Sequence, residues 1–416
     1  MIVAPVPPGL PPGRVSITEP SLPPRPIPPM NAPFACIAVV PPGLEEPGAA
    51  ELAALGAEAV QPLRRAVAFR CDDACLYRLH LRARLPFRIL RELARFPCNG
   101  PEQLYAGVQA SADWDHWLPP QRSFRVEVSG TAPGLSHSHF TALQVKNAIV
   151  DRQRQRWGAR SSIDLEDPDL CLHLHLGAAK RGSEAVLSLD GSAGSLHRRG
   201  WRAAMGLAPL KENLAAGLIG FTGWDGRVPL ADPLCGSGTL LIEAACAALG
   251  RAPGLVGREL ALRRWADFDA VLWERESASA AALARDDLAE GLPLAPIIGM
   301  ERDQAVLEQA AANATAAGVA PWLALQHGDC RDFVPPPQPG VIVCNPPYGE
   351  RLGAGEDLEQ LYGDLGAMVK ARCSGWTLWL LSGNAERTGA LRMKASRRIP
   401  VSNGGIDCRW LKYEIR

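Results

Sequence analysis

The sequence has few of the features that mark a secreted, membrane-spanning or metal-binding chain. Its 416 residues include 11 cysteines, an odd number, and no two of them stand in a CxxC pair. Free thiols in a reducing compartment explain this usage better than a disulfide framework does. No apolar run approaches the ~20 residues that span a bilayer, and no basic stretch followed by an apolar core opens the chain. We therefore expect a soluble, cytoplasmic protein without a membrane partner.

The chain as a whole also lacks net charge, because 44 Lys and Arg residues balance 44 Asp and Glu residues. The balance does not hold locally. From Val60 to Arg202, 21 basic residues stand against 14 acidic ones, a net of +7 (21 − 14), which leaves −7 for the rest of the chain. A basic region beside an acidic one favours a polyanion as the partner of the basic region. Taken alone, the same pattern also fits a solvated surface.

Prolines make up eleven of the first thirty residues. Such a segment cannot bury a core and favours solvated polyproline II conformations. We expect residues 1–30 to form a disordered tail, with a proline-rich docking motif as the alternative. Strand and helix patterns begin at Phe34, and they predict a small α+β module over residues 34–95. The segment from Phe87 to Phe96 fits a strand or a short helix equally well.

A second module is predicted over residues 96–191. Residues 170–176 alternate as a strand does, and residues 139–157 have the pattern of an amphipathic helix. The inward side chains of this helix are expected to be Leu143, Val145, Ile149 and Val150. Basic residues on its outward face are predicted to bind RNA, with a solvated face as the alternative: Lys146, Arg152, Arg154 and Arg156.

Histidines occur in two close pairs in this module, His137 with His139 and His173 with His175. The second pair would share one face of a strand, which permits metal ligation. Histidines that face solvent on a strand are common, and no CxxC pair of the kind found in zinc sites accompanies them. We therefore expect no metal site.

From residue 192 to residue 416 strands and helices alternate, which is the pattern of an open α/β sheet. One short strand runs to Asp232 and is followed by Pro-Leu-Cys-Gly-Ser-Gly-Thr and an apolar helix. A glycine-rich turn between strand and helix lets the backbone approach a ligand and directs free N–H groups at it. No Gly-Lys-Ser/Thr follows, so the turn is not a Walker A loop and a nucleoside triphosphate is disfavoured. The turn predicts a ligand at the carboxyl edge of the sheet.

Acidic residues follow the next two predicted strands. The strand over residues 296–301 ends in Glu301, where an acid can accept both hydroxyls of a ribose. The strand over residues 323–327 leads to Asp329, which can accept a hydrogen bond from an adenine amino group. The alternative is that Glu301 is an ordinary surface acid and Asp329 an ordinary turn acid, neither of which binds a ligand.

The motif with the most specific chemistry follows a fully apolar strand over residues 341–344 and consists of Asn345, Pro346, Pro347 and Tyr348. The exocyclic amine of a base is a poor nucleophile, because its lone pair is delocalised into the ring. The Asn345 side-chain oxygen and the Pro346 carbonyl can accept the two amine hydrogens, and Tyr348 can stack on the extruded base. A Pro-Pro turn that caps a strand would explain the prolines but not the whole set. We predict that these four residues are catalytic.

The stretch from Asp232 to Thr239, together with Asn345-Pro-Pro-Tyr-Gly-Glu-Arg-Leu352, resembles the class I methyltransferases that modify base amino groups. More narrowly, the chain resembles the bacterial 23S rRNA (guanine-N2)-methyltransferases, in their THUMP plus first methyltransferase half only. Further stretches fit the same family: Leu196–Trp201, Ala208–Ala215, Asn403–Cys408 and, in the THUMP domain, Lys146–Asp151.

This resemblance implies a Rossmann-like methyltransferase domain over residues 192–416, with a seven-stranded, mostly parallel sheet. A ferredoxin-like module over residues 34–95 and a THUMP domain over residues 96–191 would precede it. The implied cofactor is S-adenosyl-L-methionine (SAM). The residues expected to bind it are Asp232, Leu234, Cys235, Gly236, Gly238, Thr239, Glu301, Asp329 and Lys211.

The reaction that the resemblance implies is methyl transfer to the exocyclic N2 of a guanine in large-subunit rRNA. The second methyltransferase that the fused bacterial enzymes carry downstream is not expected here. Three alternatives stay open: a tRNA guanine-N2 methyltransferase, an adenine-N6 nucleic-acid methyltransferase, and an RNA-binding ribosome-assembly protein without activity. The oligomeric state is left undetermined.

Overall fold

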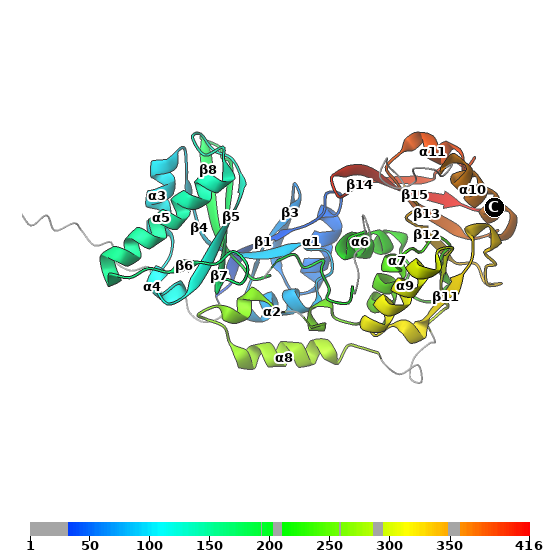
Figure 1. Ribbon diagram of the computed structural model, residues 1–416, viewed down its shortest axis with the longest axis horizontal. Helices are drawn as coiled ribbons and strands as arrows, with labels where there is room; N and C mark the ends of the chain where they lie inside the picture. Colours follow the sequence, from blue (N-terminus) through cyan, green and yellow to red (C-terminus); the bar gives the residue numbers. More distant parts are fainter. Residues whose placement is uncertain (1–31, 193, 203–209, 258, 286–293, 348–357) are drawn as a thin grey trace, which may run out of the picture. The chain divides into compact units, whose positions relative to one another are not determined.

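Two β-sheets organise the chain in the computed structural model (Figure 1). The structure describes residues 32–192, 194–202, 210–257, 259–285, 294–347 and 358–416. The expected tail, residues 1–30, lies outside these residues. Among the described residues, no helix is long and apolar enough to cross a membrane.

The first sheet has eight strands in the order β2-β3-β1-β4-β8-β7-β5-β6. These strands are β1 (Phe34–Val39), β2 (Glu58–Leu63), β3 (Ala66–Cys71), β4 (Arg88–Pro97), β5 (Ser123–Gly130), β6 (Ser162–Ile163), β7 (Leu170–Ala178) and β8 (Ser183–Asp190). The helices of this part of the chain are α1 (Glu45–Ala54), α2 (Asp73–Arg82), α3 (Pro101–Ser111), α4 (Trp114–Trp117) and α5 (Ser138–Trp157).

Strand β4 joins the two N-terminal modules into one sheet. It pairs antiparallel with β1, where Cys36 lies opposite Arg91, and with β8, where Arg91 lies opposite Leu189. The segment that fitted a strand or a helix is therefore a strand, because partners from both modules satisfy its backbone hydrogen bonds. It runs through the expected domain boundary between residues 95 and 96.

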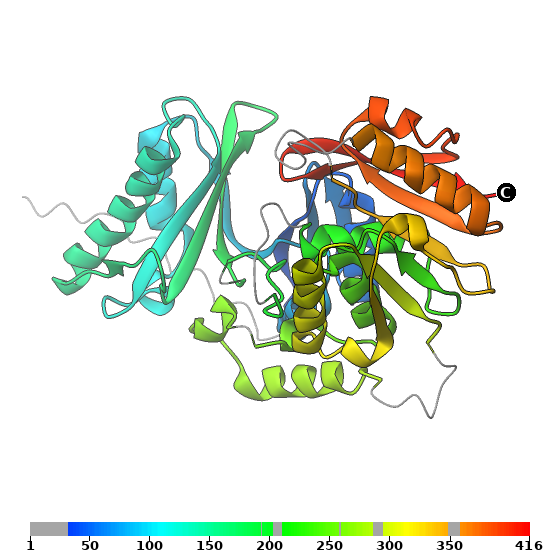
Figure 2. The ribbon, with the colours of Figure 1, turned by 45° about the vertical axis from the view of Figure 1, so that its right-hand side comes forward.

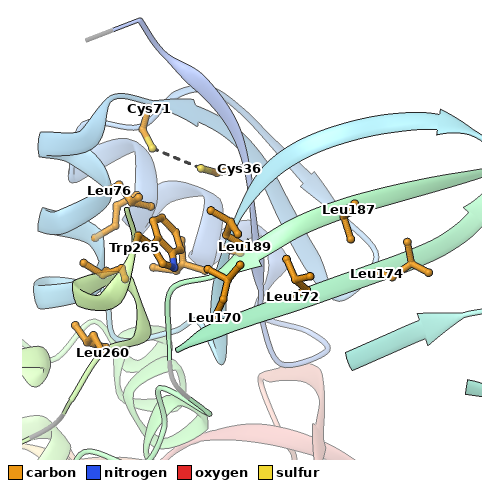
Figure 3. Close-up of a cluster of buried hydrophobic side chains, with 14 of the residues drawn as sticks. Cys36, Cys71, Leu76, Leu170, Leu172, Leu174, Leu187, Leu189, Leu260 and Trp265 are labelled. Carbon is orange, nitrogen blue, oxygen red and sulfur yellow. Dashed lines mark hydrogen bonds between the residues drawn. The ribbon is translucent and has the colours of Figure 1, made fainter. Parts of the chain in front are cut away.

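Leucines on one face of β7 and β8 belong to the core of this part, and Figure 3 shows Leu172, Leu174, Leu187 and Leu189 in one cluster with Trp265. Helices α3 and α5 pack on the same core. Val145, Ile149 and Val150 of α5 are buried as predicted, but Leu143 is 38% exposed, so its predicted inward position is wrong. Leu143 lies one heptad before Val150 and so on the same side of the helix, but Phe140 beside it is also 41% exposed, so the N-terminal end of this face extends beyond the core.

The second sheet has seven strands in the order β11-β10-β9-β12-β13-β15-β14. They are β9 (Leu230–Asp232), β10 (Ile297–Glu301), β11 (Leu323–His327), β12 (Val341–Cys344), β13 (Thr377–Ser382), β14 (Arg397–Asn403) and β15 (Ile406–Glu414). The helices are α6 (Glu212–Thr222), α7 (Thr239–Ala248), α8 (Ala270–Ala281), α9 (Gln304–Ala316), α10 (Leu358–Arg372) and α11 (Ala385–Gly389). Short 3₁₀ turns are η1 (Pro253–Leu255), η2 (Ala261–Arg264), η3 (Ala320–Trp322) and η4 (Cys330–Asp332).

Five strands of this sheet, β9 to β13, run parallel, and β15 lies antiparallel to both β13 and β14. The predicted seven-stranded, mostly parallel sheet is therefore confirmed. Helices pack on both faces, and Figures 1 and 2 show α7 and α10 on different sides. Val341 and Val343 pack with α6 and α7, whereas Ile342 and Cys344 pack with α10. A strand buried on both faces has to be apolar throughout, as β12 is.

The residues from Pro33 to Arg416 form one compact unit, and Arg84 helps to connect its parts. The guanidinium of Arg84, which lies between α2 and β4, donates to the Cys246 carbonyl of α7 at 2.9 Å. It also donates to the Arg251 carbonyl and faces the buried Glu243 carboxylate, with Nη1 and Oε2 3.7 Å apart. The ferredoxin-like module is thus bound to α7, the helix that follows the glycine-rich turn over residues 233–238, called the glycine turn below.

Candidate active site

The predicted site residues come together because their strands are neighbours. β9 lies between β10 and β12, with Gly299 opposite Asp232 on one side and Ile342 opposite Ala231 on the other. Adjacent strands lie ~4.8 Å apart, so Asn345 follows β12 directly beside the turn that follows β9. The strand order also changes direction between β9 and β12, and open α/β sheets bind ligands at such a switch point.

The glycine turn has room for a ligand over Gly236. This residue has φ +53°, and a side chain on it would meet no other atom within 4 Å. Gly238 has φ +81° and is the N-cap of α7, without a side chain to bond the free N–H groups of the first turn. A side chain on Gly238 would come within 3.3 Å of Ala310, so this glycine lets α9 pack closely. The turn therefore offers N–H donors and open space together.

Glu301 connects the end of β10 to the glycine turn. Its Oε2 accepts a hydrogen bond from the Gly236 N–H at 3.1 Å, and its Oε1 accepts one from the Asp303 N–H at 3.0 Å. Each carboxylate oxygen has a further lone pair, so both can still accept a hydroxyl.

Asp232 and Cys235, at the end of β9 and in the turn that follows it, are both buried. Asp232 is 2% exposed and accepts a hydrogen bond from the Leu234 N–H at 3.0 Å. Burial, with a smaller contribution from the Glu301 charge, raises the pKa of Asp232 to about 8. Burial also raises the pKa of the Cys235 thiol, which makes this cysteine a packing residue rather than a nucleophile.

The remaining predicted cofactor residues lie at the ends of other elements. Asp329 precedes η4 and accepts hydrogen bonds from the Arg331 backbone at 2.9 Å and from Arg331 Nε at 2.8 Å. This arginine lowers the pKa of Asp329. Lys211 is the N-cap of α6, and its Nζ lies 5.0 Å from the centroid of the Phe87 ring, a cation–π contact with the first module.

The structure describes residues 345–347 of the four-residue motif that is predicted to hold the target base. Asn345 is half-buried, and its Oδ1 atom is buried without a hydrogen-bond partner in the described part of the chain. Pro346 is buried and Pro347 is half-buried. Tyr348 lies outside the described residues, so its predicted stacking role stays a prediction. A buried acceptor without a partner costs about 1–3 kcal/mol, which a functional role can justify.

The four basic residues predicted to bind RNA differ in their surroundings. Arg154 and Arg156 have side chains 58% and 60% exposed, near Asp151 and Asp115. Lys146 is half-buried. Arg152 is half-buried and donates to the Gln109 carbonyl of α3 at 3.0 Å, so part of its hydrogen-bonding capacity is used within the fold.

Two residues beside the glycine turn were missed by sequence reasoning. Arg202 donates to Glu212, Leu210 and Thr239, and Asn313 of α9 donates to the Ser237 carbonyl at 3.1 Å. Nothing in the sequence distinguishes Arg202 from the other arginines near it. In the described ranges, no group of three or more His, Cys, Asp or Glu side chains is arranged to hold a metal.

Three family models match consecutive parts of the chain. Residues 35–90 match a ferredoxin-like domain of the RlmL type, residues 100–190 match the THUMP domain, and residues 199–412 match the RMKL-like methyltransferase domain. A Synechocystis protein provisionally assigned as an RNA methyltransferase is 43% identical over 373 residues, which is 90% of this chain and 94% of that protein.

The large-subunit rRNA methyltransferase K/L of Syntrophotalea carbinolica is 38% identical over 395 residues. This match covers 93% of the chain and 54% of that protein, so the chain spans about half the length of this curated relative. Among solved structures, the crystal structure of a provisionally assigned methyltransferase in complex with SAH has a similar fold, with a TM-score of 0.80. The two sequences are 28% identical, and the match covers 92% of this chain and 98% of the chain in that crystal structure.

SAH is what remains of SAM after its methyl group has been transferred, so the SAH complex and the family match indicate SAM as the cofactor. The match of residues 199–412 extends over the whole second sheet described above, apart from the end of β15. The chain belongs to the RMKL-like family of class I methyltransferases, with a THUMP domain and a ferredoxin-like domain before its methyltransferase domain.

Proposed function

We propose that this protein transfers the methyl group of SAM to the exocyclic N2 of a guanine in large-subunit rRNA. The observation that carries the proposal is the pairing of β9 with β12, which brings Asn345 beside the glycine turn. A methyl donor at the turn and a base amine at Asn345 would then be neighbours. The names of the K/L relatives support large-subunit rRNA as the substrate.

The residues present fit SAM. The open space over Gly236 leaves room for a ligand against the backbone, and the first turn of α7 offers free N–H groups. The Glu301 carboxylate can accept the two ribose hydroxyls without losing its bonds to Gly236 and Asp303. Asp329, at the end of the neighbouring strand, can accept from the adenine amino group. When bound, SAM supplies an electrophilic methyl group on a positively charged sulfur.

Asn345 and Pro346 prepare the amine for attack. The Oδ1 atom of Asn345 has no partner within the described ranges, so it is free to accept one amine hydrogen, and the Pro346 carbonyl can accept the other. These two bonds favour a pyramidal nitrogen whose lone pair points away from the ring. Tyr348 would stack on the base and keep the nitrogen in line with the methyl group. The methylated nitrogen then carries a positive charge and releases one of its protons to water, so no base of shifted pKa is needed.

The THUMP domain would hold the folded RNA while the methyltransferase domain acts. Arg154 and Arg156 are exposed on α5, and such side chains can contact phosphates. A substrate of this kind would place the protein where ribosomes are assembled, which in bacteria such as Syntrophotalea carbinolica is the cytoplasm.

The proposal is tested by incubating the purified chain with radiolabelled SAM and unmodified rRNA, tRNA or DNA, followed by mass spectrometry of the nucleosides. We expect N2-methylguanine in 23S rRNA and none in the other two. N2-methylguanine in tRNA alone would move the substrate to tRNA, and N6-methyladenine alone would move the target to adenine. RNA binding without any methylated product would favour the ribosome-assembly alternative.

A further inference from the structure

Arg202 joins three segments of the methyltransferase domain that meet beside the glycine turn. Its Nε donates to Glu212 Oε1 at 3.1 Å, and its Nη2 donates to the Leu210 carbonyl at 3.0 Å and to Thr239 Oγ1 at 3.1 Å. The side chains of Arg202 and Glu212 are 10% and 4% exposed. One guanidinium therefore binds the start of α6 and the start of α7 at the same time.

Both of these helix starts include a residue that is predicted from the sequence to bind the cofactor, Lys211 at α6 and Thr239 at α7. Thr239 follows Gly238 and begins α7, whose first N–H groups have no side-chain cap. Lys211, which lies between Leu210 and Glu212, is the N-cap of α6. The distance between the two starts decides whether both can contact one cofactor molecule, and hydrogen bonds through Arg202 set this distance.

The chemistry of the side chain suits this task. A guanidinium is planar and offers five donors in fixed directions, so it can bind three acceptors from different segments without freedom to rotate. The buried Glu212 carboxylate needs a cation beside it, because burial raises its pKa and the Arg202 charge opposes that shift. A lysine in the same place would keep the charge but could not direct donors at all three acceptors.

We infer that Arg202 is a positioning residue of the SAM site, one that holds the α6 and α7 starts at the separation that the cofactor needs. This inference rests on the proposed function, because it presumes that SAM binds at the glycine turn. In this inference Arg202 acts through Thr239 and the segment from Leu210 to Glu212, to which it is hydrogen-bonded, and not by contact with the cofactor or the base.

The test compares wild-type protein with Arg202→Lys by calorimetric titration with SAH and by methylation kinetics on rRNA. We expect the Kd for SAH and the KM for SAM to rise about tenfold, with kcat and the KM for RNA within about twofold of wild type. A Thr239→Val variant removes one acceptor, and its effect should be less than additive with Arg202→Lys. Independent, additive effects would contradict a joint action of the two residues.

Arg199→Lys is the matched control. Arg199 belongs to the same segment and binds a buried acid, Glu243, with Nε and Oε1 3.3 Å apart, but no hydrogen bond connects it to Thr239 or Leu210 in the described structure. We expect Arg199→Lys to lower the melting temperature and to leave SAH affinity within about twofold of wild type. Equal loss of SAH affinity in both variants, or unchanged affinity in Arg202→Lys, would overturn the inference. A wild-type protein that binds no SAH would instead overturn the proposed function.

Discussion

The carboxylate of Glu301 accepts a hydrogen bond from the backbone N–H of Gly236 at 3.1 Å. Two segments 65 positions apart in the sequence are thereby fixed at the mouth of the proposed cofactor site. The same carboxylate accepts from the Asp303 N–H, so one acid holds both the turn and the loop after β10. Its position therefore determines where a ribose could be bound.

Replacing Glu301 with Gln should weaken SAH binding about tenfold, because an amide has one acceptor oxygen where the carboxylate has two. Isothermal titration with SAH measures the effect. Asp303→Asn is the control: Asp303 caps α9 by accepting from the Ala305 and Val306 N–H groups, and Asn caps helices about as well. SAH affinity that falls equally in both variants would mean that the loop as a whole, rather than the Glu301 carboxylate, holds the ligand.

Asn345→Ala should reduce kcat by about 10²–10³-fold while SAH and RNA affinities stay close to wild type. The free energy of unfolding should not fall, because the Oδ1 atom that is removed has no partner among the described residues. Methylation kinetics and urea unfolding measure the two effects.

Asn213→Ala provides the contrast for stability. Asn213 is buried, and its Nδ2 donates to the Leu85 carbonyl at 3.0 Å. Its removal leaves that buried carbonyl with one bond fewer, and should therefore lower the free energy of unfolding by about 1–3 kcal/mol. An Asn345→Ala protein that is destabilised to the same degree would show that Asn345 has a structural role.

The buried carboxyl of Asp232 should make stability depend on pH. Its pKa is raised from 3.8 to about 8 in the folded protein, so the folded chain keeps a proton that the unfolded chain releases near pH 4. The free energy of unfolding that this group contributes therefore falls as the pH rises from about 4 to about 8. Asn does not titrate, so Asp232→Asn removes this decrease in the free energy of unfolding. Relative to wild type, the variant should therefore become more stable as the pH rises from about 4 to about 8.

Urea unfolding of wild type and Asp232→Asn at several pH values between 4 and 9 measures this gain. Asp225→Asn is a suitable control, because the Asp225 side chain is 56% exposed. A stability difference between Asp232→Asn and wild type that does not change with pH would show that Asp232 is ionised in the folded protein.

Some basic residues of α5 should contribute to RNA binding and others to the stability of the fold. Replacing Arg154 and Arg156 together by Ala should weaken rRNA binding, because two exposed side chains that could contact phosphates are removed. The slope of log K against the logarithm of the salt concentration, where K is the binding constant, should become smaller in magnitude by about 1–2. Arg152→Ala should act mainly on stability, since Arg152 donates to the Gln109 carbonyl. Filter binding at several salt concentrations, together with thermal melting, distinguishes the two effects. Unchanged salt dependence in the double variant would place the RNA elsewhere.

Much of the site could be predicted because its signals are local. The glycine turn needs positive φ at Gly236 and Gly238, and the apolar strand before Asn345 must be buried on both faces. Arg202 could not be found in this way. Its three acceptors belong to segments that meet only in the folded chain, and a guanidinium in a sequence carries no mark of what it will bind.

By itself, the sequence determined the seven-stranded methyltransferase fold, through motifs that resemble a known family, and the strands that alternate strictly, such as β7. The tertiary structure decided that residues 88–97 form a strand, because hydrogen-bond partners from β1 and β8 select it over a helix. It also decided that Leu143 faces solvent. Hydrophobic period and turn preference act over a few residues, whereas strand partners and the acceptors of a buried arginine come from segments far away in the chain.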